Sequence, residues 1–310
     1  MFGEIEGTGF EVIDGSFEDC FIHHARVERL WTGARWSEGV AWFPAGRYAV
    51  WSDIPNDRML RWDETDGSVS VFRQPSMNSN GNTVDGQGRL VTCEHRGRRV
   101  TRTEHDGGIT VLADAYEGRR LNSPNDVVVK SDGSVWFTDP TYGITRDYEG
   151  ERAESEIGSS NVYRIDPATG AVKAVATDFD QPNGLAFSPD ERFLYVSDTG
   201  GSRADTRLRH IRRMTVEGKG LSGGAIFAEC TAGVFDGFRL DEAGRIWSSA
   251  HDGVHCIDPE GRLIGKVRIP EKVANVCFAG KWRNRLLIAG TTSLYSIYLD
   301  VRGARTPMAA

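Results

Sequence analysis

The 310-residue sequence has no apolar run longer than a β-strand and no excess of basic residues. Its first residues, MFGEIEGTGFEVID, have neither a basic start nor an apolar centre, so we expect neither a signal peptide nor a transmembrane helix. With 44 acidic and 37 basic residues the net charge is −7, which argues against phosphate-rich partners. We therefore expect no nucleic acid and no membrane as a partner.

Cysteine is scarce and follows no pattern. The five cysteines are odd in number and show no CxxC spacing, so neither a disulfide framework nor a thiolate metal site is indicated. The sequence predicts free and mostly buried thiols, and it favours a reducing cytoplasm as the location.

A long stretch with the 3.6-residue period of an amphipathic helix is also missing, which argues against parallel α/β folds. A different unit recurs, in which an acidic or amide residue is followed by an apolar strand, a turn and a second strand, as in SEGVAWFPAGRYAVWSD. The units open at Glu38, Asn80, Asn125, Asn183, Asp236 and, less regularly, Asn275. Their spacings of 42, 45, 58, 53 and 39 residues match the period of propeller blades.

The repeat predicts an all-β fold, a six-bladed β-propeller of four-stranded antiparallel blades. One domain would occupy residues 1–310, with an N-terminal extension over about residues 1–25. The last unit contains only three strands, so residues 26–32 are predicted to supply its outermost strand and to close the ring. Deleting residues 1–32 should then cost much more stability than deleting residues 302–310.

The six opening residues stand at equivalent positions, so their side chains are expected to form a ring at one mouth of the central channel. Every one is a carboxylate or a carboxamide, and oxygen donors of this kind suit calcium, magnesium and manganese. Asn and Asp also form ordinary turns and cap strand ends, which is the alternative. Five regular positions favour a cation site, with Asn275 as its weakest member.

A second ring is predicted fourteen or fifteen residues further along each unit, where the next strand ends. Its members are Asp53, Glu94, His95, Asp139, Asp198 and His251. The aspartates are expected to accept backbone N–H groups of the next turn. His95 is a candidate proton shuttle or substrate contact, with a structural role as the alternative.

One interruption of the repeat, residues 142–160, is too long for a hairpin loop. Because it follows the strand end nearest the predicted ring, we interpret it as a lid or substrate wall that carries Tyr142 and Tyr148 to sugar hydroxyls. A disordered insertion is the alternative.

Several strings carry a family resemblance: SEGVAW, LNSPNDVVVKSDGSVWFTDPTYG, QPNGLAFSPDERFLYVSDTG and FDGFRLDEAGRIW. They resemble the senescence marker protein / gluconolactonase / luciferin-regenerating-enzyme-like family, most closely its bacterial gluconolactonase branch, over about residues 30–300. The resemblance implies a six-bladed propeller, a divalent cation at the end of the channel and hydrolysis of sugar lactones.

The resemblance also implies roles for single residues. The metal ligands fall on Glu38, Asn183 and Asp236, and Asn125 is either a ligand or a substrate-binding amide. The resemblance gives no role to Asn80, which we assign to the substrate from its place in the same ring. Animal members carry a substrate-holding arginine where this chain has Ser123, and Arg203 is a candidate replacement.

We therefore expect a divalent metal cation, with calcium as the first choice and magnesium, manganese or zinc as alternatives. It would polarise the lactone carbonyl for attack by water. Asp236 can give one oxygen to the metal and keep the other as a general base, with pure ligation as the alternative. A metal-dependent hydrolase of other esters or phosphotriesters and a non-catalytic binding propeller are the other functions considered.

Overall fold

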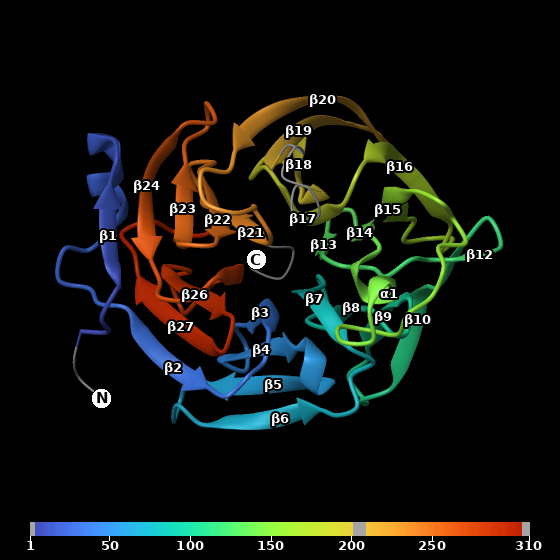
Figure 1. The fold of residues 1–310 in the computed structure, drawn as a ribbon, viewed down its shortest axis with the longest axis horizontal. Coiled ribbons are helices and arrows are strands. Elements are labelled where there is room, and N and C mark those ends of the chain that lie inside the picture. Colours follow the sequence, from blue (N-terminus) through green and yellow to red (C-terminus); the bar gives the residue numbers. More distant parts are fainter. Residues whose placement is uncertain (1–3, 201–208, 306–310) are drawn as a thin grey trace.

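The computed structural model describes residues 4–200 and 209–305. Figure 1 shows the predicted six-bladed ring, with antiparallel sheets arranged around a central channel. In each blade, strands that follow one another along the chain lie side by side from the axis outward, and the last two blades each gain an outer strand from the N-terminal part of the chain. This order explains the regular spacing of the repeat.

Blades I to III are formed in chain order. Blade I consists of β3 (Ser37–Phe43), β4 (Tyr48–Asp53), β5 (Arg58–Asp63) and β6 (Val69–Arg73). Blade II consists of β7 (Ser79–Val84), β8 (Leu90–Glu94), β9 (Arg99–Thr103) and β10 (Ile109–Ala113). Blade III consists of β13 (Val127–Val129), β14 (Val135–Asp139), β15 (Ser160–Ile165) and β16 (Val172–Phe179).

Blades IV to VI complete the circle. Blade IV consists of β17 (Pro182–Phe187), β18 (Phe193–Asp198), β19 (His210–Glu217) and β20 (Gly220–Glu229). Blade V consists of β21 (Phe238–Leu240), β22 (Ile246–Ala250), β23 (Gly253–Ile257), β24 (Leu263–Arg268) and β1 (Gly9–Val12). Blade VI consists of β25 (Val273–Ala279), β26 (Arg285–Gly290), β27 (Ser293–Tyr298) and β2 (Glu28–Thr32).

A few short elements lie between the blades. They are the hairpin of β11 (Ala115–Tyr116) and β12 (Arg119–Arg120), the helix α1 (Tyr142–Thr145), and the 3₁₀ turns Gly15–Cys20 and Ile54–Asn56. In the described part of the chain no helix is long and apolar enough to cross a membrane.

Burial falls from the axis outward. The inner strand β3 is buried along its whole length, whereas the outer strand β10 is exposed over three of its five residues. Inner strands are covered on both faces by neighbouring blades, which is why nearly every residue of β3, β7 and β17 is buried, polar residues included. Six clusters of buried apolar side chains in the described residues each join two neighbouring blades.

The ring closes as predicted. β2 pairs with β27, from Glu28 opposite Ser296 to Thr32 opposite Ser293, so the N-terminal part of the chain completes blade VI. Arg285 of β26 adds an ion pair to Glu28 across this seam. The closure removes a free sheet edge that would otherwise be open to pairing with another chain.

Both ends of the chain make contacts with blade V that the sequence did not predict. β1 lies on the outside of β24 and makes blade V five-stranded, and Phe10 stacks on Phe21 with ring centroids 4.1 Å apart. At the other end, the Ala304 N–H donates to the Leu240 carbonyl and the Glu242 N–H to the Arg302 carbonyl. The N-terminal extension therefore covers the outer edge of blade V. Residues 302–305 are hydrogen-bonded to the C-terminal end of β21 and the turn that follows it.

All five cysteines are free, as predicted, and Cys20, Cys93 and Cys256 are buried.

Candidate functional site

The opening residues of the repeat lie where the inner strands leave regular pairing. β3, β7, β17 and β25 each shift register at this level, and β13 and β21 begin only two residues after Asn125 and Asp236. Backbone groups at this level bond to the next blade instead: the Gly81 N–H donates to the Asn125 carbonyl at 2.7 Å. The six positions thus form one continuous ring around the axis.

Glycine follows the ring residue in four blades, at Gly39, Gly81, Gly184 and Gly237. At Gly184 a side chain would collide with the Asp236 carbonyl of the next blade and would stand 2.9 Å from the Gly237 Cα. The missing Cβ lets neighbouring blades meet backbone to backbone. This close approach fixes the distances between the ring side chains.

A hydroxyl residue near the end of the second strand adds a bond between blades. Ser52 donates to the Asn80 carbonyl at 2.7 Å, Thr138 to the Asn183 carbonyl at 2.7 Å, and Ser197 to the Asp236 carbonyl at 3.1 Å. Blades I, III and IV therefore each hold the ring residue of the next blade in place.

The aspartates that follow these hydroxyl residues have structural roles. Asp139 accepts the backbone N–H groups of Asn122 and Ser123, each at 2.8 Å, and Asp53 and Asp198 make matching bonds in their own blades. The structural role was predicted, and Asp198 accepts the Gly200 N–H of the following segment at 3.0 Å, as expected. The bonds that all three aspartates share go instead to the segment that precedes the inner strand, because the antiparallel pair brings these two ends together.

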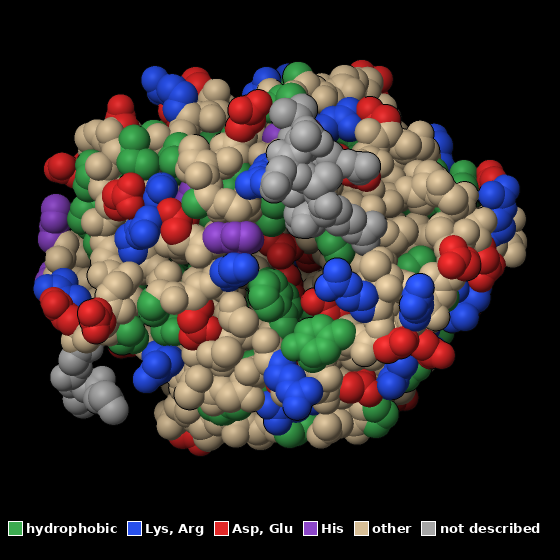
Figure 2. All heavy atoms as spheres, viewed as in Figure 1, with side chains coloured by type: hydrophobic (Ala, Val, Ile, Leu, Met, Phe, Trp, Pro, Cys, Tyr) green, Lys and Arg blue, Asp and Glu red, His purple; other side chains and the backbone are tan. Residues whose placement is uncertain are grey.

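Glu38 and Asp236 form a carboxylate pair on this ring. Their carboxyl groups lie close enough to share a proton, and the Asn183 and Asn275 amides hydrogen-bond to Asp236 and Glu38 respectively. Glu38 is 4% exposed, whereas Asp236 keeps some contact with solvent. Figure 2 shows acidic side chains in a hollow near the middle of this face.

Burial is the main cause of the unusual electrostatics of the pair. It raises the pKa of Asp236 to about 8, with further contributions from the charges of Asp126 and Glu149. Burial, followed by the charge of Asp236, raises the pKa of Glu38 well above its usual range. Two carboxylates held together with little water favour either a shared proton or a bound cation.

Two further groups near the pair were missed or undervalued by sequence reasoning. Asn275 is 1% exposed, and its Oδ1 has no hydrogen-bond partner in the described structure. Asp126, next to Asn125, is 2% exposed and faces Arg239, with 3.5 Å between Oδ2 and Nη1. The repeat pattern indicated Asn275 only as the weakest member of the ring. Asp126 was missed because it follows Asn125 at a position where four other units have glycine.

These donors fit a hard divalent cation. The carboxylates of Glu38 and Asp236 would balance two positive charges, while Asn183 and the unpartnered oxygen of Asn275 add neutral oxygen ligands. Within residues 4–200 and 209–305 no group of three or more His, Cys, Asp or Glu side chains could hold a metal alone. Such a site would therefore depend on the amides.

His95 connects the ring to the long loop of blade III. It is fully buried, its Nδ1 lies 2.9 Å from the Glu149 carbonyl, and its Nε2 lies 3.1 Å from Asn80 Nδ2. Because a carbonyl can only accept, Nδ1 carries the proton and Nε2 accepts from Asn80. Burial lowers the pKa of His95 to about 4, so the ring is neutral at physiological pH.

The remaining predicted substrate residues are placed as follows. Asn125 is 5% exposed, and its side chain makes no hydrogen bond in the described part of the chain. The Tyr142 hydroxyl lies 2.8 Å from Thr199 Oγ1, and Thr199 in turn accepts from Asn183 at 3.4 Å. Tyr148 is 52% exposed. Arg203 lies outside the described residues.

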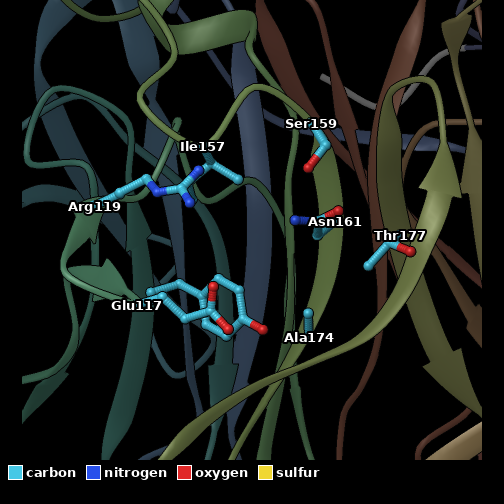
Figure 3. A pocket seen from close by; sticks show the side chains of 8 residues that line it. Glu117, Arg119, Ile157, Ser159, Asn161, Ala174 and Thr177 are labelled. Carbon is cyan, nitrogen blue, oxygen red and sulfur yellow. The ribbon is translucent and has the colours of Figure 1, made fainter.

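A separate cavity of about 200 Å³ lies away from the ring, between the β11–β12 hairpin and blade III (Figure 3). It is lined by Tyr116, Glu117, Arg119, Ile157, Ser159, Asn161, Ala174 and Thr177. None of the ring residues lines it, so it is not the predicted site.

The family model of the SMP-30/Gluconolactonase/LRE-like region matches residues 36–292, which include every ring position. The chain belongs to this family. A gluconolactonase from Zymomonas mobilis is 29% identical over 288 residues, covering 85% of this chain and 78% of the relative. The family, predicted from the motifs, is thereby confirmed.

Solved structures agree with the fold. The structure of a gluconolactonase from Xanthomonas campestris is 38% identical, covers 95% of both chains and has a TM-score of 0.88. The calcium-binding protein regucalcin from Agrobacterium tumefaciens is 20% identical, with 91% of this chain and 96% of that chain covered and a TM-score of 0.73. This second likeness concerns the fold alone.

Proposed function

We propose that this chain is a divalent-cation-dependent lactonase that opens sugar lactones with water. The observation that carries the proposal is the convergence of Glu38, Asp236 and Asn183 on one point of the axial ring. Gluconolactonases among the relatives support sugar lactones as the substrate class.

Glu38, Asp236 and Asn183 would hold the cation, with Asn125 or Asn275 completing the protein ligands. When bound, the cation supplies positive charge that polarises the lactone carbonyl and stabilises the developing oxyanion. Calcium is our first choice because every available donor is an oxygen.

Asp236 is proposed as the general base. It is the member of the carboxylate pair that keeps contact with solvent, so one of its oxygens can accept a proton from the attacking water. The Asn183 amide, which donates to Asp236, would hold the carboxylate in orientation. No covalent intermediate is needed, because water attacks the carbonyl carbon directly.

His95 is better suited to positioning than to proton transfer. Both of its ring nitrogens are engaged, and with a pKa of about 4 it has no proton to give or take near neutrality. By accepting from Asn80 Nδ2 it orients that amide, whose oxygen can then face a substrate hydroxyl. Asn80 and Asn125 are accordingly proposed as substrate-binding amides.

A pH-stat assay tests the proposal. The protein is stripped with a chelator, its metal content is checked by elemental analysis, and single cations are restored during hydrolysis of D-glucono-1,5-lactone, with the spontaneous rate subtracted. We expect activity to disappear on stripping and to return with a divalent cation. Full activity of the metal-free protein, or activity restored only towards a phosphotriester such as paraoxon, would contradict the proposal.

A further inference from the structure

The loop between β14 and β15 is anchored to both sides of the ring. The Gly143 N–H donates to Ser123 Oγ at 3.0 Å, and the Tyr142 hydroxyl meets Thr199. A few residues later the Glu149 carbonyl accepts from His95. Ser123 therefore holds the loop in place.

These anchors hold Glu149 at the edge of the ring, beside His95. The residue is separated from Asn80 by only the imidazole ring of His95. Its carboxyl group lies close enough to Asp236 to raise the pKa of that residue. Backbone groups of Gly143 and Glu149 make the hydrogen bonds that fix the loop. The position of the loop therefore does not depend on the side chain of Glu149.

The Glu149 carboxylate lacks the partners that a partly buried acid usually has. Burial raises its pKa, and the charge of the exposed Arg146 offsets this only in part. In the described residues the carboxylate makes no hydrogen bond or ion pair with another side chain. An ionised carboxylate can only accept hydrogen bonds, so a suitable partner must bring donors.

We propose that Glu149 is a substrate-binding residue whose carboxylate accepts hydrogen bonds from the hydroxyl groups of a neutral sugar lactone bound at the ring. The proposal rests on the lactonase function proposed above. Two adjacent hydroxyls of an aldonolactone match the two oxygens of one carboxylate. A third negative group near Glu38 and Asp236 also disfavours lactones that carry an acidic substituent.

The test compares two lactones that share the reacting ring. D-Glucono-1,5-lactone carries hydroxyl groups, whereas δ-valerolactone has none. For Glu149→Gln we expect kcat/KM for the sugar lactone to fall about 10- to 100-fold through a higher KM, as when a charged hydrogen-bond acceptor is lost. The rate with δ-valerolactone should stay within about twofold, because the reacting groups are unchanged.

Glu151→Gln is the matched control, because Glu151 belongs to the same loop and is exposed. It should change neither rate. A second measurement uses D-glucitol, which has hydroxyls but no carbonyl, as an inhibitor of δ-valerolactone hydrolysis. Its inhibition constant should rise in Glu149→Gln and stay unchanged in Glu151→Gln.

The outcomes separate the two proposals. If Glu149→Gln lowers both lactone rates equally, or changes neither rate nor the glucitol constant, Glu149 does not bind hydroxyls and this proposal is overturned. If the wild-type protein with its cation hydrolyses neither lactone, the lactonase function itself fails and the substrate role of Glu149 fails with it. Melting temperatures of both variants identify any loss of fold.

Discussion

Gly184→Ala tests the geometry of the ring without altering a proposed ligand. The added Cβ would collide with the Asp236 carbonyl and lie 2.9 Å from the Gly237 Cα. Carbon atoms in contact prefer about 3.5–4.0 Å, so the backbones of blades IV and V must separate by about 1 Å. Both atoms that it meets belong to the backbone and cannot rotate away, so the strain must move Asp236.

A displacement of about 1 Å near reacting groups can cost about 100-fold in rate, and overpacking costs about 1–3 kcal/mol of stability. We expect losses of this size in kcat/KM for D-glucono-1,5-lactone and in the free energy of unfolding by denaturant. Gly15→Ala is the control, since a Cβ there meets nothing within 4 Å and φ is not positive. A Gly184→Ala protein with wild-type kcat/KM would refute the argument that blade contacts position Asp236.

Three further predictions concern the base, a buried histidine and the N-terminal strand. Asp236→Asn should lose about 10²–10⁴-fold in kcat even at saturating cation, measured by metal titration, whereas recovery of wild-type turnover would leave Asp236 as a ligand only. His95 has a pKa of about 4 when folded and about 6.5 when unfolded, so the unfolded chain binds more protons between these values and stability rises with pH. Denaturation curves at pH 4 and pH 7 measure this rise in the free energy of unfolding, and His95→Gln should remove about 3 kcal/mol of it. An equal rise in the variant and the wild type would contradict the burial of His95. Phe10→Ala should cost about 1–2 kcal/mol of unfolding free energy through the lost contact with Phe21 and leave kcat/KM unchanged, while a loss of activity would mean that β1 influences the ring.

The ring and the blades could be predicted because the repeat carries them. A residue eight positions before a turn recurs in five units, and symmetry then places Glu38, Asn183 and Asp236 at one level. The closing strand β2 could be inferred as well, because the last blade lacked a strand. These features depend on local pattern and on the need to pair every strand.

Features outside the repeat gave no such indication. β1 is a short strand within a segment that resembles no blade. It pairs with β24 beside Gly265, where the missing side chain leaves room for Phe17. Glu149 lies in a loop without periodicity, and hydrogen bonds of the loop at Tyr142, Gly143 and the Glu149 carbonyl bring it to the ring. Asn275 was undervalued because its unit is irregular, although its buried oxygen belongs to the same ring.

The most direct test of the account is a titration of the stripped protein with calcium, in which bound metal and turnover of D-glucono-1,5-lactone are measured on the same samples. We predict that turnover rises in proportion to bound cation and reaches its maximum at one ion per chain. Wild-type turnover in samples without bound metal would contradict the central claim that the Glu38–Asp236 ring works through a cation.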